Sequence, residues 1–395
     1  MRIPLAFGCC LSLLVASLLV ITPVEAGDRP PPVSTAPRMR AISSLDMITA
    51  SKGWGWGAVR VYRTLDGGAH FVDVTPPGLT SARPIMQLTA SDALHAWILT
   101  GSPAGFGPST LYRTTNGGSA WTRFTIPVRQ AGQLTFIDPL HGWMQSGGFT
   151  DNHRVNIITL RRTADGGRTW SVIYQTRVRI PIEPNVQRGG CEWSSPAFSN
   201  AAHGVVGLTC DHSAVLRLAL TNDGGKTWRR VTLPPFPHRK GRILSSMVQR
   251  PFLVGNKGTL FASLCIGTST SCYEYGALYR TSDGGRTWHR TSTTIRGDSP
   301  LFADGMHVWL PPDSCVGSCP HTPSLLRTHD GGSHWAYLPL PRFLAPNLHG
   351  DQLFQFVTPS IGFAVITREF DPHAHFFRTG DGGRTWQVFY PRIIK

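Results

Sequence analysis

The stretch RTADGGRTW at residues 162–170 is one of seven similar segments in this 395-residue chain. Asp-Gly-Gly is typical of a hairpin turn in which glycine takes the positive φ angle, while the Asp and Thr side chains bond the backbone of the turn. The tryptophan that follows packs the returning strand against its neighbours. The acidic or amide residue of the seven segments lies at Asp66, Asn116, Asp165, Asp223, Asp283, Asp330 and Asp381.

The segments recur roughly every 50 residues, a period that is typical of propellers and other repeat arrays. A second, weaker motif precedes each segment, and its best copy is FIDPLHGW at residues 136–143. Each module therefore contains two hairpins, which is four strands and the content of one propeller blade. The pattern predicts an all-β chain of seven four-stranded antiparallel blades, with both turn motifs at one end of the blades and the variable loops at the other.

These motifs resemble the Asp-box, or BNR, repeat, and their pairing resembles the exported propellers related to the photosystem II stability and assembly factor. The resemblance covers roughly residues 40–395 and implies a seven-bladed β-propeller. It implies no single activity, because such propellers occur in proteins of unlike functions.

An arginine precedes six of the seven Asp boxes and forms a second candidate site. In the assembly-factor propellers an arginine patch is implicated in partner binding, so the resemblance implies the same role here. The alternative is that each arginine pairs with an Asp or a carbonyl of the neighbouring blade. The six residues are Arg63, Arg113, Arg162, Arg280, Arg327 and Arg378.

The N-terminus predicts an export signal at residues 1–26, because Arg2 precedes an apolar stretch from Leu5 to Ile21 and small Ala26 closes the segment. An uncleaved segment of this length would serve as a membrane anchor. Residues 27–39 are a Pro-rich linker, and residues 40–395 are the propeller. We therefore expect an exported protein, located outside the cell, in the envelope or in the periplasm.

Six cysteines follow the signal, and an even number in an exported chain favours disulfides over metal binding. Their spacing predicts three local pairs, Cys191–Cys210, Cys265–Cys272 and Cys315–Cys319. Zinc bound through the last pair is the alternative. Otherwise no metal and no cofactor are predicted.

The chain has 38 Lys and Arg against 23 Asp and Glu, and its net charge of +15 favours anionic partners. Basic and aromatic residues gather in the variable loops, where they suit an acidic protein segment or an anionic glycan. A solvated basic rim is the alternative, and we expect a monomer that binds no specific nucleic acid. The predicted binding residues are Arg177, Arg179, Arg188, Trp193, Arg239, Lys240, Arg242, Tyr273 and Tyr275.

No catalytic residue is predicted from the repeated motifs. Equivalent residues of successive blades are spread around a ring, so neither the Asp-box carboxylates nor His95, His141, His203 and His307 of the second motif converge on one substrate or metal. The main prediction is therefore a non-catalytic docking or assembly module.

A glycoside hydrolase is the alternative function. A sialidase would need an Arg triad, a Tyr paired with Glu, and an Asp, but Arg179-Ile180-Pro181 follows the third Asp box, whereas the corresponding sialidase motif precedes the first. A hydrolase with two loop carboxylates would draw them from Asp151, Asp211, Asp298, Asp313, Asp351 and Asp371.

Overall fold

The computed structural model describes residues 42–101, 108–126, 131–149, 155–179, 191–238, 240–268, 271–292, 294–296, 299–311, 324–341, 344, 352–368 and 371–394. They belong to one compact unit, Thr35–Lys395, and their regular structure is β-strand. None of these residues belongs to a helix that is long and apolar enough to cross a membrane. The predicted signal and linker lie outside the described residues.

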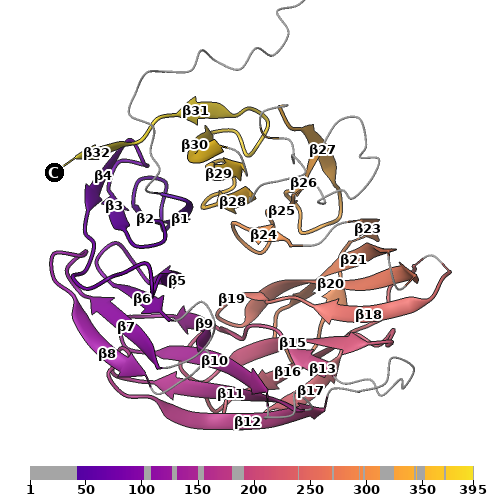
Figure 1. Cartoon of the computed structure of the whole chain (residues 1–395). Coiled ribbons are helices and arrows are strands. Elements are labelled where there is room, and N and C mark those ends of the chain that lie inside the picture. Colours follow the sequence, from indigo (N-terminus) through magenta and orange to yellow (C-terminus); the bar gives the residue numbers. More distant parts are fainter. Residues whose placement is uncertain are drawn as a thin grey trace, which may run out of the picture. The chain divides into compact units, whose positions relative to one another are not determined.

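The strands form a β-propeller, in which small sheets stand around a central opening (Figure 1). The first module contains β1 (Ser44–Met47), β2 (Gly53–Trp56), β3 (Val61–Thr64) and β4 (His70–Asp73). The second contains β5 (Ile85–Ala90), β6 (Ala96–Thr100), β7 (Ser109–Thr114) and β8 (Thr122–Ile126). The third contains β9 (Ala131–Phe136), β10 (Gly142–Phe149), β11 (Val155–Thr163) and β12 (Ser171–Arg179).

The sixth and seventh modules have the same order. The sixth contains β24 (Leu301–Phe302), β25 (Val308–Leu310), β26 (Ser324–Thr328) and β27 (Ala336–Pro339). The seventh contains β28 (Gln352–Phe356), β29 (Gly362–Arg368), β30 (Asp371–Thr379) and β31 (Gln387–Phe389). The last strand, β32 (Arg392–Ile394), pairs in parallel with β4, so the C-terminal end of the described chain is hydrogen-bonded to the first module.

The fourth and fifth modules share a single sheet of eleven strands. The fourth contributes β13 (Cys191–Trp193), β14 (Ala197–Phe198), β15 (Gly204–Asp211), β16 (Arg217–Thr221) and β17 (Arg229–Thr232). The fifth contributes β18 (Ile243–Val248), β19 (Phe252–Val254), β20 (Lys257–Thr268), β21 (Ser271–Thr281), β22 (His289–Arg290) and β23 (Ile295–Arg296).

The structure therefore has five separate blades of four or five strands and one merged sheet, and the prediction of seven separate four-stranded blades is wrong. The register of β15 gives the reason. Its partner β16 pairs only as far as Gly207, because the chain turns off the sheet at His212, which has a φ of 49°. The freed edge at Thr209 to Asp211 then pairs with β18.

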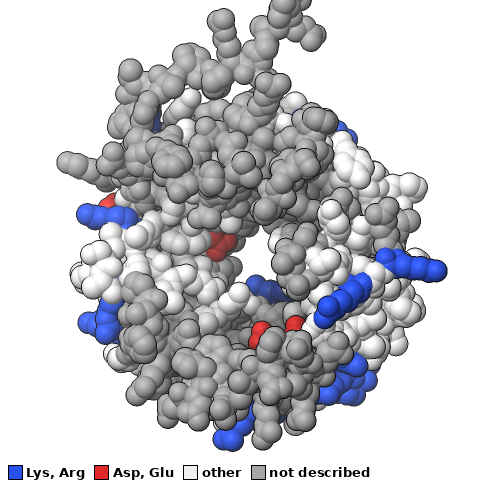
Figure 2. Space-filling view, turned by 45° about the vertical axis from the view of Figure 1, so that its right-hand side comes forward, with Lys and Arg blue, Asp and Glu red and all other residues white. Residues whose placement is uncertain are grey.

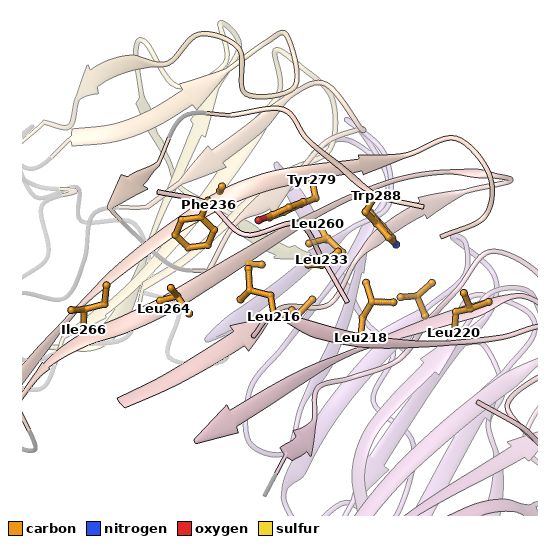
Figure 3. Close-up of a cluster of buried hydrophobic side chains, with 14 residues drawn as sticks. Leu216, Leu218, Leu220, Leu233, Phe236, Leu260, Leu264, Ile266, Tyr279 and Trp288 are labelled. Atoms are coloured by element: carbon orange, nitrogen blue, oxygen red, sulfur yellow. The ribbon is translucent and has the colours of Figure 1, made fainter. Parts of the chain in front are cut away.

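The merged sheet encloses one continuous apolar core (Figure 3). Leu218 and Leu220 of β16 lie in the same cluster as Leu260 and Leu264 of β20. The Tyr279 hydroxyl reaches from β21 to the backbone and donates to the Pro234 carbonyl at 2.6 Å. The fourth and fifth modules are thus held together by a shared core as well as by strand pairing.

Three other joints between successive modules are made by an aromatic stack and an indole hydrogen bond. Trp143 of β10 stacks on Phe198 of the fourth module with the ring centroids 3.6 Å apart, and its indole Nε1 donates to the Gly224 carbonyl at 2.9 Å. The same pair of contacts joins the second module to the third and the sixth to the seventh. The stacked pairs there are Trp97–Phe136 and Trp309–Phe356.

The seven turns, six of them Asp-Gly-Gly and the second Asn-Gly-Gly, share one geometry, and the third shows it. Gly166 and Gly167 have φ angles of 75° and 95°, the left-handed conformation that glycine adopts readily. Thr163 Oγ1 accepts a hydrogen bond from the Gly167 amide at 2.9 Å, and Asp165 Oδ1 accepts one from the Thr169 amide at 3.0 Å. The Gly166 amide donates to the Leu140 carbonyl, so both short turns of the module lie side by side, as predicted.

Asp165→Ala is expected to lower the free energy of unfolding by about 1–3 kcal/mol, because it leaves turn donors unpaired. Asp165→Asn is the matched control and should cost less, since Asn116 makes the equivalent bonds in the second module. Burial opposes ionisation, but hydrogen bonds led by those from Thr169 lower the pKa of Asp165 to about 2. The stabilisation by its charged form should therefore be lost only as the pH falls from about 4 through 2. Thermal unfolding scans of both variants between pH 7 and pH 2 measure this, and equal stability of Asp165→Ala and the wild type would contradict it.

Candidate functional site

The innermost strands of the modules surround the central opening and carry the candidate site. They are β1, β5, β9, β13 with β14, β18 with β19, β24 and β28, each the first of its module along the chain. Contacts of β28 with β1, β1 with β5, and β5 with β9 make these strands neighbours around the opening. Figure 2 shows both acidic and basic side chains at its rim.

Asp46 lies on β1, between the buried side chains of Leu45 and Met47. The Gln355 side chain reaches it from β28, where Nε2 donates to Asp46 Oδ1 at 3.4 Å and to the Met47 carbonyl at 3.0 Å. Burial raises the pKa of Asp46 to about 6, although hydrogen bonds from Gln355 and the Ala90 backbone oppose the shift. This carboxyl group both gains and loses a proton close to neutral pH, as catalytic acids and bases do.

The register explains why the sequence did not point to Asp46. Asp46 faces Trp54 across the β1–β2 ladder, and the equivalent positions of four other modules hold uncharged residues. These are Thr89, Thr135, Leu301 and Gln355. A carboxylate at a position where four other modules hold an uncharged residue could have pointed to Asp46. The second motif is weak in the first module, so the sequence alone did not align this position with the others.

Arg250 is the basic counterpart of Asp46 on the inner wall. It lies between β18 and β19, the innermost strands of the fifth module, and its side chain is exposed. The surrounding protein nevertheless lowers the pKa of this guanidinium by burial, with no compensating charge.

Glu192 on β13 is the second carboxylate that the innermost strands carry within the described part of the chain. Its side chain is exposed, and its backbone pairs with Thr209 of β15. Asp46 lies on the first module and Glu192 on the fourth. Neither residue is among the loop carboxylates that the sequence suggested for a hydrolase.

The predicted binding residues fall into two groups. Arg242 and Tyr273 both lie beside the same end of β20. The Arg242 carbonyl accepts a hydrogen bond from the Gly267 amide, and Tyr273 pairs with Ile266. Lys240, Arg242 and Tyr273 are exposed, and Tyr275 is half-buried on the same strand as Tyr273. These four residues form what we call the hairpin patch.

The second group lies on the third and fourth modules. Arg177 is exposed on β12, whereas Trp193 is half-buried, stacked on Tyr174 at 4.7 Å and set edge-on against Trp228 at 5.0 Å. Trp193 is therefore part of the packing between strands. The side chains of Arg179, Arg188 and Arg239 lie outside the described residues.

The arginines before the Asp boxes lie in the joints between modules. Arg113 donates from Nη1 to the Asp165 carbonyl at 3.1 Å and from Nη2 to the Pro139 carbonyl at 3.2 Å. Arg327 makes the equivalent pair of bonds to Asp381 and Pro359. Three of the six guanidinium groups also lie over the aromatic ring of the neighbouring strand, at 5.5 to 5.7 Å; they belong to Arg162, Arg327 and Arg378. These contacts favour the alternative of pairing with the neighbouring blade.

The histidines of the second motif are paired within their own turns. His141 Nδ1 lies 2.8 Å from Asp138 Oδ2, and the Asp138 carboxylate also accepts from the Leu140 and His141 amides. His95 and His307 are held in the same way by Asp92 and Asp304. Among the described residues, no three His, Cys, Asp or Glu side chains are grouped as they would be around a metal ion.

The predicted disulfide Cys191–Cys210 is confirmed, and it joins β13 to β15 beside the merged edge. Cys265 is also disulfide-bonded. The side chain of its predicted partner, Cys272, lies outside the described residues, as does the predicted pair Cys315–Cys319.

No protein-family model matches the chain, and no curated protein matches it. Several solved protein structures match the chain in fold. An ulvan lyase of polysaccharide lyase family PL25, bound to -[GlcA(1-4)Rha3S]-, aligns with a TM-score of 0.53 and 11% identity over 88% of this chain and 96% of its own. A prolyl endopeptidase aligns with a TM-score of 0.54 and 10% identity over 88% of this chain but 49% of its own.

An α-L-arabinofuranosidase from Fusarium graminearum aligns less well, with a TM-score of 0.41 and 14% identity over 76% of this chain and 90% of its own. At these identities the likeness concerns the β-propeller fold.

Proposed function

We propose that this protein cleaves an acidic glycan at its central opening, with Asp46 as the group that transfers the proton. The observation that carries the proposal is the carboxyl group of Asp46 on an innermost strand, with a pKa raised by burial to about 6. A buried carboxylate with a raised pKa lowers the stability of the fold. Such groups are therefore found mainly at catalytic sites, where their function requires them.

Two carboxyl groups acting together are the usual requirement for cleavage of a glycosidic bond. Protonated Asp46 donates its proton to the glycosidic oxygen as the bond breaks. Glu192, the other inner-wall carboxylate of the described chain, acts on the opposite side of the sugar, where it activates the attacking water or supports the developing positive charge.

The choice of an acidic glycan has two supports. The net charge of +15 attracts polyanions and repels cationic substrates. The ulvan lyase that shares the fold is bound to a glycan with glucuronic acid and a sulfated sugar, so a propeller of this kind accommodates an acidic glycan.

The proposal is tested by incubating the full chain with uronic-acid, sulfated and neutral polysaccharides and following new reducing ends and unsaturated uronic acid products. We expect cleavage of an acidic glycan, with a rate that falls as the pH rises through about 6, because the protonated form of Asp46 is the donor. A rate that is independent of pH between 5 and 7 would contradict the role of Asp46.

A docking function on the hairpin patch is the second candidate. The observation that favours it is that exposed Lys240, Arg242 and Tyr273 come together beside one strand end, as a surface for an acidic protein segment or an anionic glycan requires. If the acidic polysaccharides are bound and not cleaved, and the double variant Lys240→Glu and Arg242→Glu loses this binding, docking is the function.

We also propose that the chain belongs among the exported Asp-box propellers. The seven equivalent turns support this kinship. The disulfide Cys191–Cys210 supports export, because such bonds persist in oxidising compartments.

A further inference from the structure

The Gln355 side chain reaches from the seventh module to the first and makes three hydrogen bonds there. Its Oε1 accepts from the Met47 amide at 2.8 Å, and its Nε2 donates to the Met47 carbonyl at 3.0 Å and to Asp46 Oδ1 at 3.4 Å. Because the Met47 amide can only donate, it must face Oε1, and the two hydrogens of Nε2 are then directed at the carbonyl and the carboxyl group. The backbone of β1 therefore fixes the orientation of the Gln355 amide.

A second glutamine makes the same pair of backbone bonds at another joint, without a carboxyl group beside it. Gln87 of β5 accepts from the Leu134 amide of β9 at 2.8 Å and donates to the Leu134 carbonyl at 2.8 Å. The residue before Leu134 is the uncharged Gln133, whereas the residue before Met47 is Asp46. The backbone bonds alone can thus join two modules, and the bond to Asp46 is the feature that distinguishes Gln355 from Gln87.

The strands in contact with β1 carry no charged or titratable side chain. These strands are β2, β5 and β28, with the sequences GWGW, IMQLTA and QLFQF. Asp46 itself is half-buried, and the hydrogen bonds that favour its charged form come from Gln355 and from the Ala90 backbone. Of these two donors, Gln355 is the one that a substitution can remove.

We propose that Gln355 is a positioning residue for Asp46, which holds the carboxyl group so that Oδ1 accepts a hydrogen bond and Oδ2 carries the proton to be transferred. This proposal rests on the proposed function, for which it names the residue that orients the acid. Without the Nε2 donor, either oxygen can carry the proton, and the group is freer to rotate about χ2. When Oδ2 gives up its proton, the electron pair of the O–H bond stays on the carboxylate, and Nε2 stabilises the negative charge.

The test is Gln355→Met in the full chain, which keeps the length of the side chain and removes its hydrogen bonds. The titration of Asp46 is followed by NMR of protein labelled at the Asp carboxyl carbons, with the signal assigned by its loss in Asp46→Asn. We expect Asp46 to titrate at a higher pH than in the wild type, because the hydrogen bond favours the charged form. On a glycan that the wild type cleaves, kcat should fall about 2- to 10-fold, the range for one hydrogen bond, with KM nearly unchanged.

Gln87→Met is the matched control. It removes the equivalent backbone bonds to Leu134 and leaves Asp46 untouched, so the Asp46 titration and the turnover should both stay as in the wild type. Gln355→Glu is a second variant, in case the methionine variant is unstable. It keeps an acceptor for the Met47 amide and replaces the donor with a carboxylate, so it should also move the Asp46 titration to higher pH.

Two results overturn the proposal. One is an unchanged Asp46 titration in both Gln355 variants. The other is an equal loss of turnover in Gln87→Met and Gln355→Met, since Gln355 would then act only by joining modules. The titration needs no substrate, so it separates this proposal from the proposed function. If no glycan is cleaved but the titration shifts in the Gln355 variants alone, Gln355 orients Asp46 and the proposed function fails. If Asp46-dependent cleavage and the titration are both unchanged in these variants, the proposed function stands and the positioning role fails.

Discussion

Asp46→Asn is expected to abolish cleavage of the acidic glycan and at the same time to make the folded protein more stable at pH 7. The loss of turnover should be about 10²- to 10⁴-fold, the usual contribution of a general acid. The amide keeps the size of the side chain and the contact with Gln355, but it has no proton to donate at the pH of the reaction.

The gain in stability follows from the direction of the pKa shift. The folded protein holds the Asp46 proton more tightly than the unfolded chain does, so this group supports folding below pH 3.8 and loses that support as the pH rises through about 6. Removing the buried charge at pH 7 should therefore add about 1–3 kcal/mol to the free energy of unfolding. The difference between Asp46→Asn and the wild type should vanish near pH 4.

Asp73→Asn is the matched control, because Asp73 lies on β4 of the same module and pairs with Arg60 at the surface, at 3.2 Å. An exposed ion pair contributes about 0–1 kcal/mol, so this variant should change neither turnover nor stability greatly. Full turnover by Asp46→Asn, or a lower melting temperature at pH 7 than that of the wild type, would contradict the assignment of Asp46.

Trp143→Ala is expected to lower the free energy of unfolding by about 3–5 kcal/mol. Its side chain is 1% exposed, and it provides three contacts to a joint: the stack on Phe198, the hydrogen bond to the Gly224 carbonyl and the ring beneath the Arg162 guanidinium. Alanine removes all three and leaves a cavity between the third and fourth modules.

Two further variants separate these contributions. Trp143→Phe keeps an aromatic ring for the stack and loses only the indole donor, so it should cost about 1–3 kcal/mol through the unpaired Gly224 carbonyl. Val172→Ala changes a 55%-exposed side chain on β12 of the same module and should be nearly neutral. If thermal or denaturant unfolding shows Trp143→Ala to be no less stable than Val172→Ala, the joint is not what holds these modules together.

The features that could be predicted from the sequence depend on contacts between residues close together in the chain. The bonds of Thr163 and Asp165 in the turn span no more than four residues, so seven turns of the same residue types fold alike wherever they stand. Cys191 and Cys210 lie on adjacent strands of one module, which made their disulfide predictable from their spacing. The all-β class and the two hairpins of each module follow from the same local patterns.

Tertiary structure decided the number of separate blades and the place of the candidate site. Two modules merge because β18 pairs with the part of β15 that β16 leaves unpaired. The sequences of β16 and β18 do not indicate where that pairing ends. Gln355 meets Asp46 across 309 positions only because the seventh module closes against the first. Burial between modules then raises the pKa of an ordinary strand carboxylate, and burial is a property of the assembled fold that no local pattern of residues contains.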